Sequence, residues 1–157
     1  MITIRAMLKK DIKAVALVHT QAFIRQLSST KWITCNFNAY PRIMMFVAVN
    51  ELNQVLGYIQ WLQKSGFRKE TVIELEQIAV LPVFHGKNIG TQLITRSLKF
   101  VKEYLTHQNS ILKAVIVTTR SDNTAQHLYE KILGAKANVI IKDLYSHDEV
   151  VMISKFF

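Results

Sequence analysis

The stretch from Ile73 to Leu105 most constrains how this chain can fold, because a strand pattern and a helix pattern meet there across a glycine-containing loop. Before the loop, aliphatic residues dominate a β-type run that also carries Glu74 and Glu76. Pro82 cannot donate to a sheet ladder, so the strand is expected to end near Leu81. After the loop, apolar residues recur at helical spacing. The stretch therefore predicts a strand, a short loop and an amphipathic helix.

The loop between the predicted strand and helix has the composition of an anion-binding site. Gly86 and Gly90 allow close approach to the backbone, and Asn88 is the residue type best able to replace glycine where φ is positive. The N–H groups and dipole of the following helix favour negative charge at this point. Neither the Walker A pattern nor the dinucleotide-binding pattern GxGxxG is present. We therefore expect a site for a pyrophosphate-sized anion.

The patterns on both sides of this stretch predict one α/β domain of 157 residues, with a mixed sheet and helices on both faces. Strands are expected at about 2–6, 44–49, 55–63, 70–81, 112–119, 139–145 and 149–156. Helices are expected at about 9–23, 89–105 and 121–134, with a short helix and a loop within 25–42. Ser121 or Asp122 is predicted to cap the last helix, and Gly134 to end it.

Composition narrows the possible functions and location of the chain. The formal net charge of +9 comes from scattered Lys and Arg residues without the clusters of a nucleic-acid-binding protein, so no nucleic-acid partner is expected. The single cysteine excludes an internal disulfide, and no ligand spacing predicts a metal site. No membrane span or signal peptide is recognised, so we expect a cytoplasmic protein without a membrane partner.

Two segments resemble motifs of the GCN5-related N-acetyltransferase (GNAT) family. HGKNIGT resembles motif A, with His85 at the usual Gln/Arg position, Asn88 at the first glycine and Gly90 at the last position. SDNTAQHLYEKILGA resembles motif B, and Asn123, Leu128 and Tyr129 match it in type and order. The resemblance covers essentially the whole chain. It implies a single N-acetyltransferase domain over residues 1–157, with a mixed, mostly antiparallel sheet.

The resemblance also implies an activity and roles for particular residues. The activity is transfer of an acetyl group from acetyl-CoA to an amine, by direct attack in a ternary complex. The cofactor-binding residues carried over from the family are Ile78, Ala79 and Val80 for the pantetheine arm, His85, Gly86, Lys87, Asn88, Ile89, Gly90 and Thr91 for the pyrophosphate, and Asn123 for the pantetheine region. Tyr129 is the expected proton donor, and Glu74 or Glu76 the expected base.

Alternatives to these interpretations remain open at the level of sequence. Tyr129 could be a core tyrosine, and the two glutamates could lie on a solvated sheet edge. The whole chain could bind acetyl-CoA as a regulatory or partner module without turnover. The acceptor could be an amine-bearing small molecule or a protein, and the chain could form a homodimer.

Overall fold

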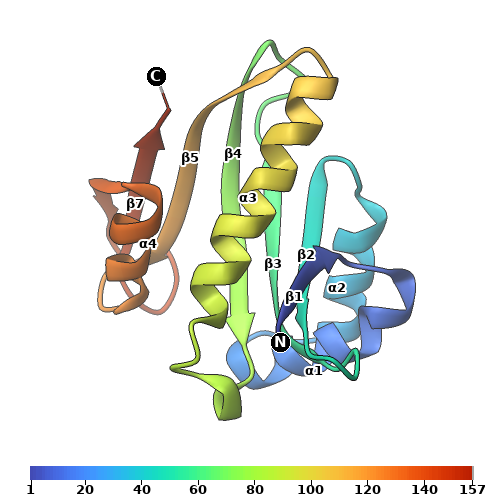
Figure 1. Cartoon of the computed structure of the whole chain (residues 1–157). Helices are drawn as coiled ribbons and strands as arrows, with labels where there is room; N and C mark the ends of the chain where they lie inside the picture. The colour runs from blue at the N-terminus through green and yellow to red at the C-terminus, as the bar shows by residue number, and fades with distance from the viewer. Residues whose placement is uncertain (157) are drawn as a thin grey trace. The chain divides into compact units, whose positions relative to one another are not determined.

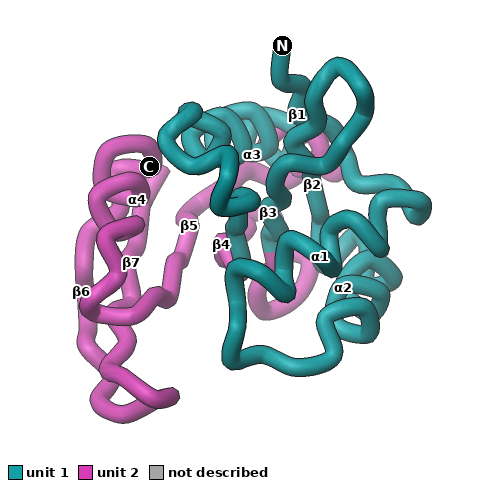
Figure 2. Tube along the Cα trace, turned by 90° about the horizontal axis from the view of Figure 1, so that it is seen from below, with its two compact units in different colours: residues 1–61, 77–101 teal, residues 62–76, 102–157 magenta. Residues whose placement is uncertain are grey.

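The computed structural model describes residues 1–156, which form two compact units. Unit 1 comprises residues 1–61 and 77–101, and unit 2 comprises residues 62–76 and 102–157, as the two colours of Figure 2 show. The strands β3 and β4 and the helix α3 each contribute residues to both units (Figure 1). Each unit is described in turn.

Unit 1 contains the first two helices and most of the glycine-containing loop region. Its elements are β1 (Thr3–Ala6), η1 (Lys9–Asp11), α1 (Ile12–Ala22), α2 (Ser29–Asn38), β2 (Ile43–Val49), most of β3 (Val55–Gln63), the last part of β4 (Glu70–Val80), η2 (Pro82–Phe84) and the first part of α3 (Ile89–His107). Strands β1 and β2 pair antiparallel, from Thr3 opposite Val49 to Ala6 opposite Phe46. Every residue of β2 is buried, which explains its continuous apolar sequence.

Unit 2 contains the C-terminal strands and the last helix. Its elements are the first part of β4 (Glu70–Val80), β5 (Ile111–Arg120), α4 (Ala125–Leu133), β6 (Lys136–Ile141) and β7 (Glu149–Lys155). Strand β5 runs parallel to β4, with Glu74 opposite Ile116, because the connection between them passes through a helix. The β5–β7 and β6–β7 pairs are antiparallel.

The strands follow the order β1-β2-β3-β4-β5-β7-β6 in one seven-stranded sheet. The expected α/β fold with a mixed, mostly antiparallel sheet is confirmed, and so is the order of elements along the chain. No helix among residues 1–156 combines the length and the apolar character needed to cross a bilayer.

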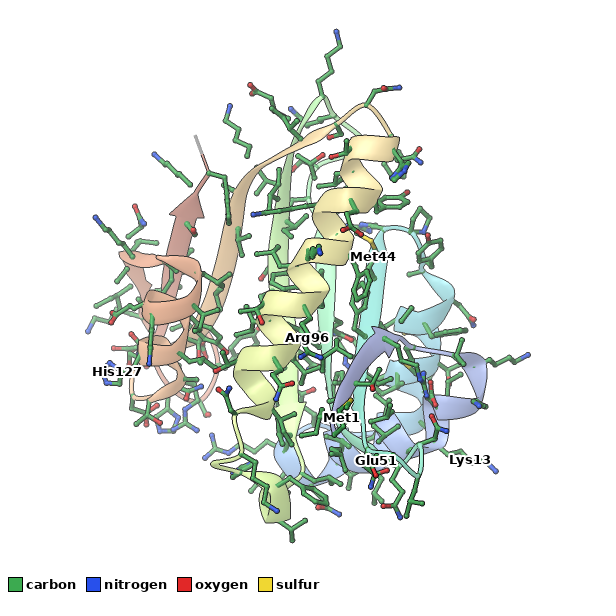
Figure 3. All side chains as sticks on the ribbon, viewed as in Figure 1. Met1, Lys13, Met44, Glu51, Arg96 and His127 are labelled. Carbon is green, nitrogen blue, oxygen red and sulfur yellow. The ribbon has the colours of Figure 1, made fainter. Side chains whose placement is uncertain are left out.

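Polar contacts hold the N-terminus and the segment between β1 and α1 in unit 1. The amino group of Met1 lies 2.8 Å from Oε1 of Glu51, and both residues are labelled in Figure 3. Arg5 donates to both carboxylate oxygens of Asp11, at 2.7 and 3.0 Å. The Asp11 carboxylate also accepts the Leu8 amide at 2.8 Å. These contacts explain why a short 3-10 turn precedes α1, where the sequence pattern predicted one continuous helix.

The predicted cap of the last helix is wrong, because α4 begins at Ala125 after Thr124, and Thr124 makes no side-chain capping bond. Asp122 forms an ion pair with Arg120 at 2.9 Å and makes no cap. The side chain of Asn123 accepts the Ala125 amide at 2.9 Å, so it satisfies one of the orphan donors at the start of α4. The other end is as predicted, because Gly134 has φ of +65° and terminates the helix.

Candidate functional site

The loop from Pro82 to Thr91 has the backbone geometry that its sequence predicts. Gly86 and Asn88 both have positive φ, at +74° and +61°. Asn88 thus occupies the left-handed region that its position in the motif predicted. Gly90 differs, because it lies within α3 and is not among the residues of positive φ. The strained conformations that reverse the chain therefore belong to Gly86 and Asn88.

This loop presents a row of backbone donors without protein partners. The amide of His85 is bonded to the Pro82 carbonyl, and the first helical bond of α3 runs from Gln92 to Asn88. Within the described residues, the six amides from Gly86 to Thr91 donate to no other protein group. Residues 85–88 are exposed, whereas Ile89 is buried and fixes the start of the helix. Several N–H groups and the positive end of the α3 dipole are thus available to an anion.

The side chains of the loop contribute less to such a site than its backbone. The ring Nε2 of His85 lies 2.8 Å from the Val80 carbonyl oxygen, and in the tautomer protonated there it donates to that oxygen. The ammonium of Lys87 lies 5.1 Å from the centre of the Phe84 ring, which is a cation–π contact. His85 is therefore held against the end of β4, and it ties the loop to the strand.

The C-terminal end of β4 is set by its neighbour in unit 1. A Cβ atom added to Gly57 of β3 would lie 2.6 Å from the Ala79 carbonyl oxygen and 3.1 Å from Cα of Val80. The Leu81 amide also donates to the Leu56 carbonyl at 2.8 Å. Only glycine permits this close backbone approach. Ile78, Ala79 and Val80 are thereby held at the point where the strand meets the loop.

Tyr129 of α4, in unit 2, is buried with 5% of its surface exposed. Burial raises the pKa of its phenol to about 12. Among the described residues, no group forms a hydrogen bond with this hydroxyl, although buried tyrosines usually have a partner. The phenol is consequently protonated throughout the physiological range and lacks a protein acceptor.

Asn123 lies just before α4 and both ends of its amide are engaged. Its Nδ2 donates to Oγ1 of Thr119 at 2.9 Å, while its Oδ1 accepts the Ala125 amide. The contacts position the start of α4 relative to β5 within unit 2. The direct role of this side chain in the structure is thus to orient the helix that carries Tyr129.

Glu74 and Glu76 occupy half-buried positions of β4 in unit 2. They alternate with the buried residues Ile73 and Leu75, so neither lies on a fully solvated edge. Oε2 of Glu74 forms an ion pair with the ammonium of Lys64 at 2.9 Å, and the Glu74 side chain is 18% exposed. The two carboxylates therefore lie on the face of β4 opposite to Ile73 and Leu75, where Glu74 is paired with a lysine.

Sequence reasoning missed the function of Gln77, which is the centre of a buried polar network in unit 1. Its Oε1 accepts from Nε1 of Trp32 at 3.0 Å and from the Tyr58 hydroxyl at 2.9 Å. Its Nε2 donates to Oε1 of Gln26 at 3.1 Å. The same Gln26 oxygen lies 2.8 Å from Nε2 of His19, which is fully buried. A glutamine next to the two glutamates of a strand that is otherwise mostly aliphatic was the one signal of this network.

The network ties the segment between α1 and α2 to β4. His19 also lies 2.8 Å from the Ser29 hydroxyl through Nδ1, so both of its ring nitrogens have partners. His19 is thus a core histidine whose hydrogen-bonding groups are both satisfied. Among residues 1–156, no group of three or more His, Cys, Asp or Glu side chains is arranged to hold a metal ion.

Comparisons with known proteins identify the fold and the family. The model of the "Acetyltransferase (GNAT) family" matches residues 13–135. Ard1 from Thermoplasma volcanium has 23% sequence identity and a TM-score of 0.78, with 99% of this chain and 98% of that chain covered. Arabidopsis thaliana NAA60 in complex with acetyl-CoA has 14% identity and a TM-score of 0.78, with 99% of each chain covered.

A third solved structure has an acceptor, spermidine, in its name. It is a chimera of the spermidine N-acetyltransferase SpeG from Vibrio cholerae and hSSAT, with 18% identity and a TM-score of 0.76, covering 98% of this chain and 95% of that chain. A search of curated proteins found no match. The three structures establish the fold, and the family match extends over more than half of the chain. The chain therefore belongs to the GNAT acetyltransferase family.

Proposed function

We propose that residues 1–157 form a single N-acetyltransferase domain that moves an acetyl group from acetyl-CoA to an amine by direct attack in a ternary complex. The observation that carries this proposal is the row of six unpaired amides from Gly86 to Thr91 at the start of α3. Membership of the GNAT family suggests the anion that these amides would bind. It is the pyrophosphate of acetyl-CoA, which accepts hydrogen bonds from backbone amides of this kind.

The residues of this chain fit coenzyme A at two places. The amides of His85, Gly86, Lys87, Asn88, Ile89, Gly90 and Thr91 belong to the loop that would hold the pyrophosphate, with the His85 amide already used within the loop. The backbone of Ile78, Ala79 and Val80 would pair with the pantetheine arm, and Asn123 would stand near that arm. When bound, acetyl-CoA supplies the activated thioester from which the acetyl group is transferred.

Tyr129 would serve as the proton donor to the departing sulfur. A thiol has a reference pKa of about 8.5 and burial raises the pKa of this phenol to about 12, so proton transfer to the thiolate is uphill and requires the hydroxyl to lie beside the sulfur as negative charge develops on it. The absence of a protein acceptor leaves its hydroxyl proton available for this role. Burial thus keeps the phenol neutral and makes it a weaker acid, so donation depends on a sulfur placed beside the hydroxyl when acetyl-CoA is bound.

Glu74 or Glu76 would assist loss of a proton from the acceptor amine, because an ammonium has no lone pair for attack. Glu74→Gln and Glu76→Gln, made separately, keep the shape and remove the basicity. The variant that lacks the base should lose rate at neutral pH and regain it at high pH, where the free amine already predominates. If both variants keep the pH profile of the unmodified protein, neither carboxylate is the base.

The experiment that tests the proposed function has a binding arm and a turnover arm. Acetyl-CoA at 100 times its Kd should stabilise the folded protein by about 2.7 kcal/mol, which a thermal shift measures. A panel of amine acceptors should then include one that accelerates release of CoA. Binding without turnover on any class of amine would favour the alternative function, a non-catalytic acetyl-CoA-binding module. Loss of both signals would refute the proposal.

A further inference from the structure

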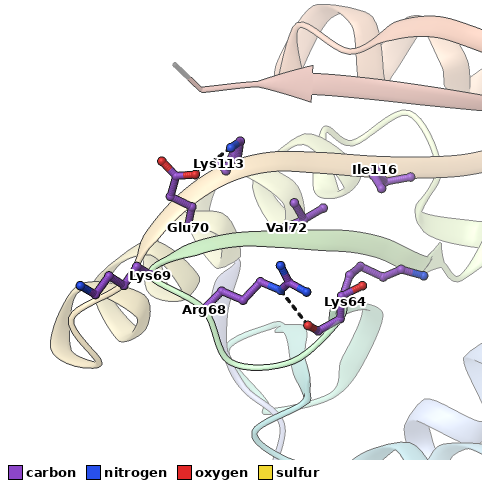
Figure 4. A pocket seen from close by; sticks show the side chains of 8 residues that line it. Lys64, Arg68, Lys69, Glu70, Val72, Lys113 and Ile116 are labelled. Atoms are coloured by element: carbon purple, nitrogen blue, oxygen red, sulfur yellow. Dashed lines mark hydrogen bonds and ion pairs between the residues drawn. The ribbon is translucent and has the colours of Figure 1, made fainter.

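A basic pocket lies in unit 2, beside the turn between β3 and β4, with a volume of about 780 Å³. Its lining includes the cationic side chains of Lys64, Arg68, Lys69 and Lys113 and the carboxylate of Glu70. Figure 4 shows these side chains around the ribbons of β4 and β5. Pockets of this size are typical of small-ligand sites. The hollow is open to solvent, and four of its lining side chains are cationic.

The backbone that carries two of these cations is held by buried hydroxyl groups. Ser110 is 6% exposed, and its hydroxyl donates to the Arg68 carbonyl at 2.6 Å and the Lys69 carbonyl at 3.2 Å. The hydroxyl of Thr71, 1% exposed, lies 2.7 Å from that of Ser110. The Ile111 amide donates to the Lys69 carbonyl at 2.9 Å. Arg68 and Lys69 therefore project from a fixed backbone.

The charges of the pocket are only partly neutralised. Lys113 pairs with Glu70 at 2.7 Å and Lys64 pairs with Glu74 at 2.9 Å. The Nε of Arg68 donates to the Ser65 carbonyl at 2.8 Å (Figure 4). The two terminal nitrogens of its guanidinium group are left to donate to a ligand. Among the described residues, neither Arg68 nor Lys69 has a carboxylate partner. Two exposed positive charges without a carboxylate partner thus line the pocket.

Apolar side chains complete the pocket beneath these charges. Val72 and Ile116 line it from the paired strands β4 and β5, and both are half-buried. An occupant would therefore contact aliphatic surface with its body and cationic groups with its ends. A ligand with carboxylates on a short organic chain has this chemistry, because guanidinium groups bind carboxylates with charge-assisted hydrogen bonds.

We infer that this pocket binds the carboxylate-bearing part of the acceptor, so that the preferred acceptor is an amine on an acidic peptide. The inference rests on the proposed function and specifies its substrate class. Lys64 connects the two places, because it lines the pocket and pairs with Glu74, one of the two candidate bases. Like-charge repulsion would disfavour a polycation such as spermidine at this pocket.

The test compares matched peptide acceptors that share one acetylatable amine and differ only in neighbouring residues, which are Glu in one peptide, Gln in the second and Lys in the third. We expect kcat/KM to be about tenfold higher for the Glu peptide than for the Gln peptide, as a charge-assisted contact would give. The Lys peptide and spermidine should be the poorest acceptors. The preference should weaken as salt is added, because the contact is partly exposed.

Two variants assign any such preference to the pocket. Lys69→Ala and Arg68→Gln should each raise KM for the Glu peptide several-fold, with kcat and acetyl-CoA affinity unchanged and the Gln peptide unaffected. Lys69→Ala removes no hydrogen bond of the turn, so it keeps the test valid if Arg68→Gln disturbs folding. Lys9→Ala with Lys13→Ala is the matched control, because it removes two exposed charges that do not line the pocket.

The outcomes separate this inference from the proposed function. Turnover without a preference for the Glu peptide, or with a preference that survives Lys69→Ala and Arg68→Gln, would overturn the inference and leave the function intact. Failure to bind acetyl-CoA would refute the function and the inference together. If acetyl-CoA binds without turnover, calorimetry with the Glu peptide decides. Binding that is lost in Lys69→Ala supports the pocket, and no binding, or equal binding, overturns it.

Discussion

The loop from Gly86 to Thr91 and the hydroxyl of Tyr129 both lack protein partners, but they lack them in opposite surroundings. The loop amides lie in an exposed stretch that includes residues 85–88, where water can satisfy them. Tyr129, in contrast, is a residue of which only 5% is exposed, so most of its ring is removed from water. Exposed backbone amides are thus hydrogen-bonded to water until an anion binds. The hydroxyl of a largely buried tyrosine has fewer partners open to it, and a ligand bound beside it is one of them.

The largest effect is expected for a substitution at Tyr129, the buried member of this comparison. Tyr129→Phe keeps the ring and its packing and removes the only proton that the phenol can donate. Turnover should fall by roughly 10²–10⁴-fold, the usual span for general acid catalysis. Acetyl-CoA affinity, measured by calorimetry, should stay nearly the same, because the loop is unchanged. An unaltered rate would show that Tyr129 is a core residue only.

The pH dependence of the free energy of unfolding tests the burial of Tyr129 independently. The pKa of Tyr129 is raised by burial from 10.0 to about 12, so the unfolded chain loses this proton at lower pH than the folded protein. The associated stability is fully present below about pH 10 and is lost as pH rises through about 12. At 1.36 kcal/mol per pH unit, the loss approaches about 3 kcal/mol.

Urea unfolding at intervals from pH 9 to pH 12 measures this loss. The difference between the unmodified protein and Tyr129→Phe isolates it, because every other titrating group is common to both. We expect the free energy of unfolding to fall more steeply with pH when the tyrosine is present. Parallel curves for the two proteins would contradict the burial of the phenol.

A glycine substitution tests the exposed loop, the other member of the comparison. Gly86→Val places a β-branched residue at φ of +74°, which should distort the loop and weaken acetyl-CoA binding about tenfold or more. Gly66→Val is the matched control, since Gly66 has φ of +92° and, like Gly86, nothing within 4 Å of an added Cβ. Calorimetry should show weaker binding for Gly86→Val alone. Equal affinities would mean that the loop backbone is not the anion site.

The smallest effect is expected for a charged side chain of the loop. Lys87 is exposed and its ammonium lies against the Phe84 ring, so Lys87→Ala should change acetyl-CoA affinity by less than about threefold. Calorimetry at two salt concentrations measures this. A loss of more than tenfold that disappears at high salt would assign the anion site to the side chain and not to the backbone amides.

Much of the fold was predictable because the informative signals are local. The alternation and the proline of the central strand predicted β4, and the glycine loop and helical spacing predicted α3. The predicted positive φ of Asn88 and the predicted end of α4 at Gly134 are both confirmed. The cap of α4 was harder, because Ser121, Asp122 and Asn123 are all suitable residue types. Only the contact between Asp122 and Arg120 decided among them.

The site was predictable in its residues but not in their environments. Motif resemblance selected Tyr129, and only the packing of unit 2 showed that the residue is largely buried, with no hydrogen bond to its hydroxyl among the described residues. The role of Gln77 depends on Trp32, Tyr58 and Gln26, which come from three other segments of the chain. A polar residue in an apolar strand signals that a partner exists, but periodicity does not say which one.

The sequence by itself determined the order of elements, the glycine loop and the family, because these depend on residues near one another in the chain. Only the tertiary structure decided where the scattered positive charges gather. Lys113 meets Glu70 because β4 and β5 pair in parallel with Glu70 opposite Ile111, and Ser110 holds the turn that carries Arg68 and Lys69. Such contacts join segments some forty residues apart. Strand register and tertiary packing determine these contacts, and a local sequence pattern predicts neither.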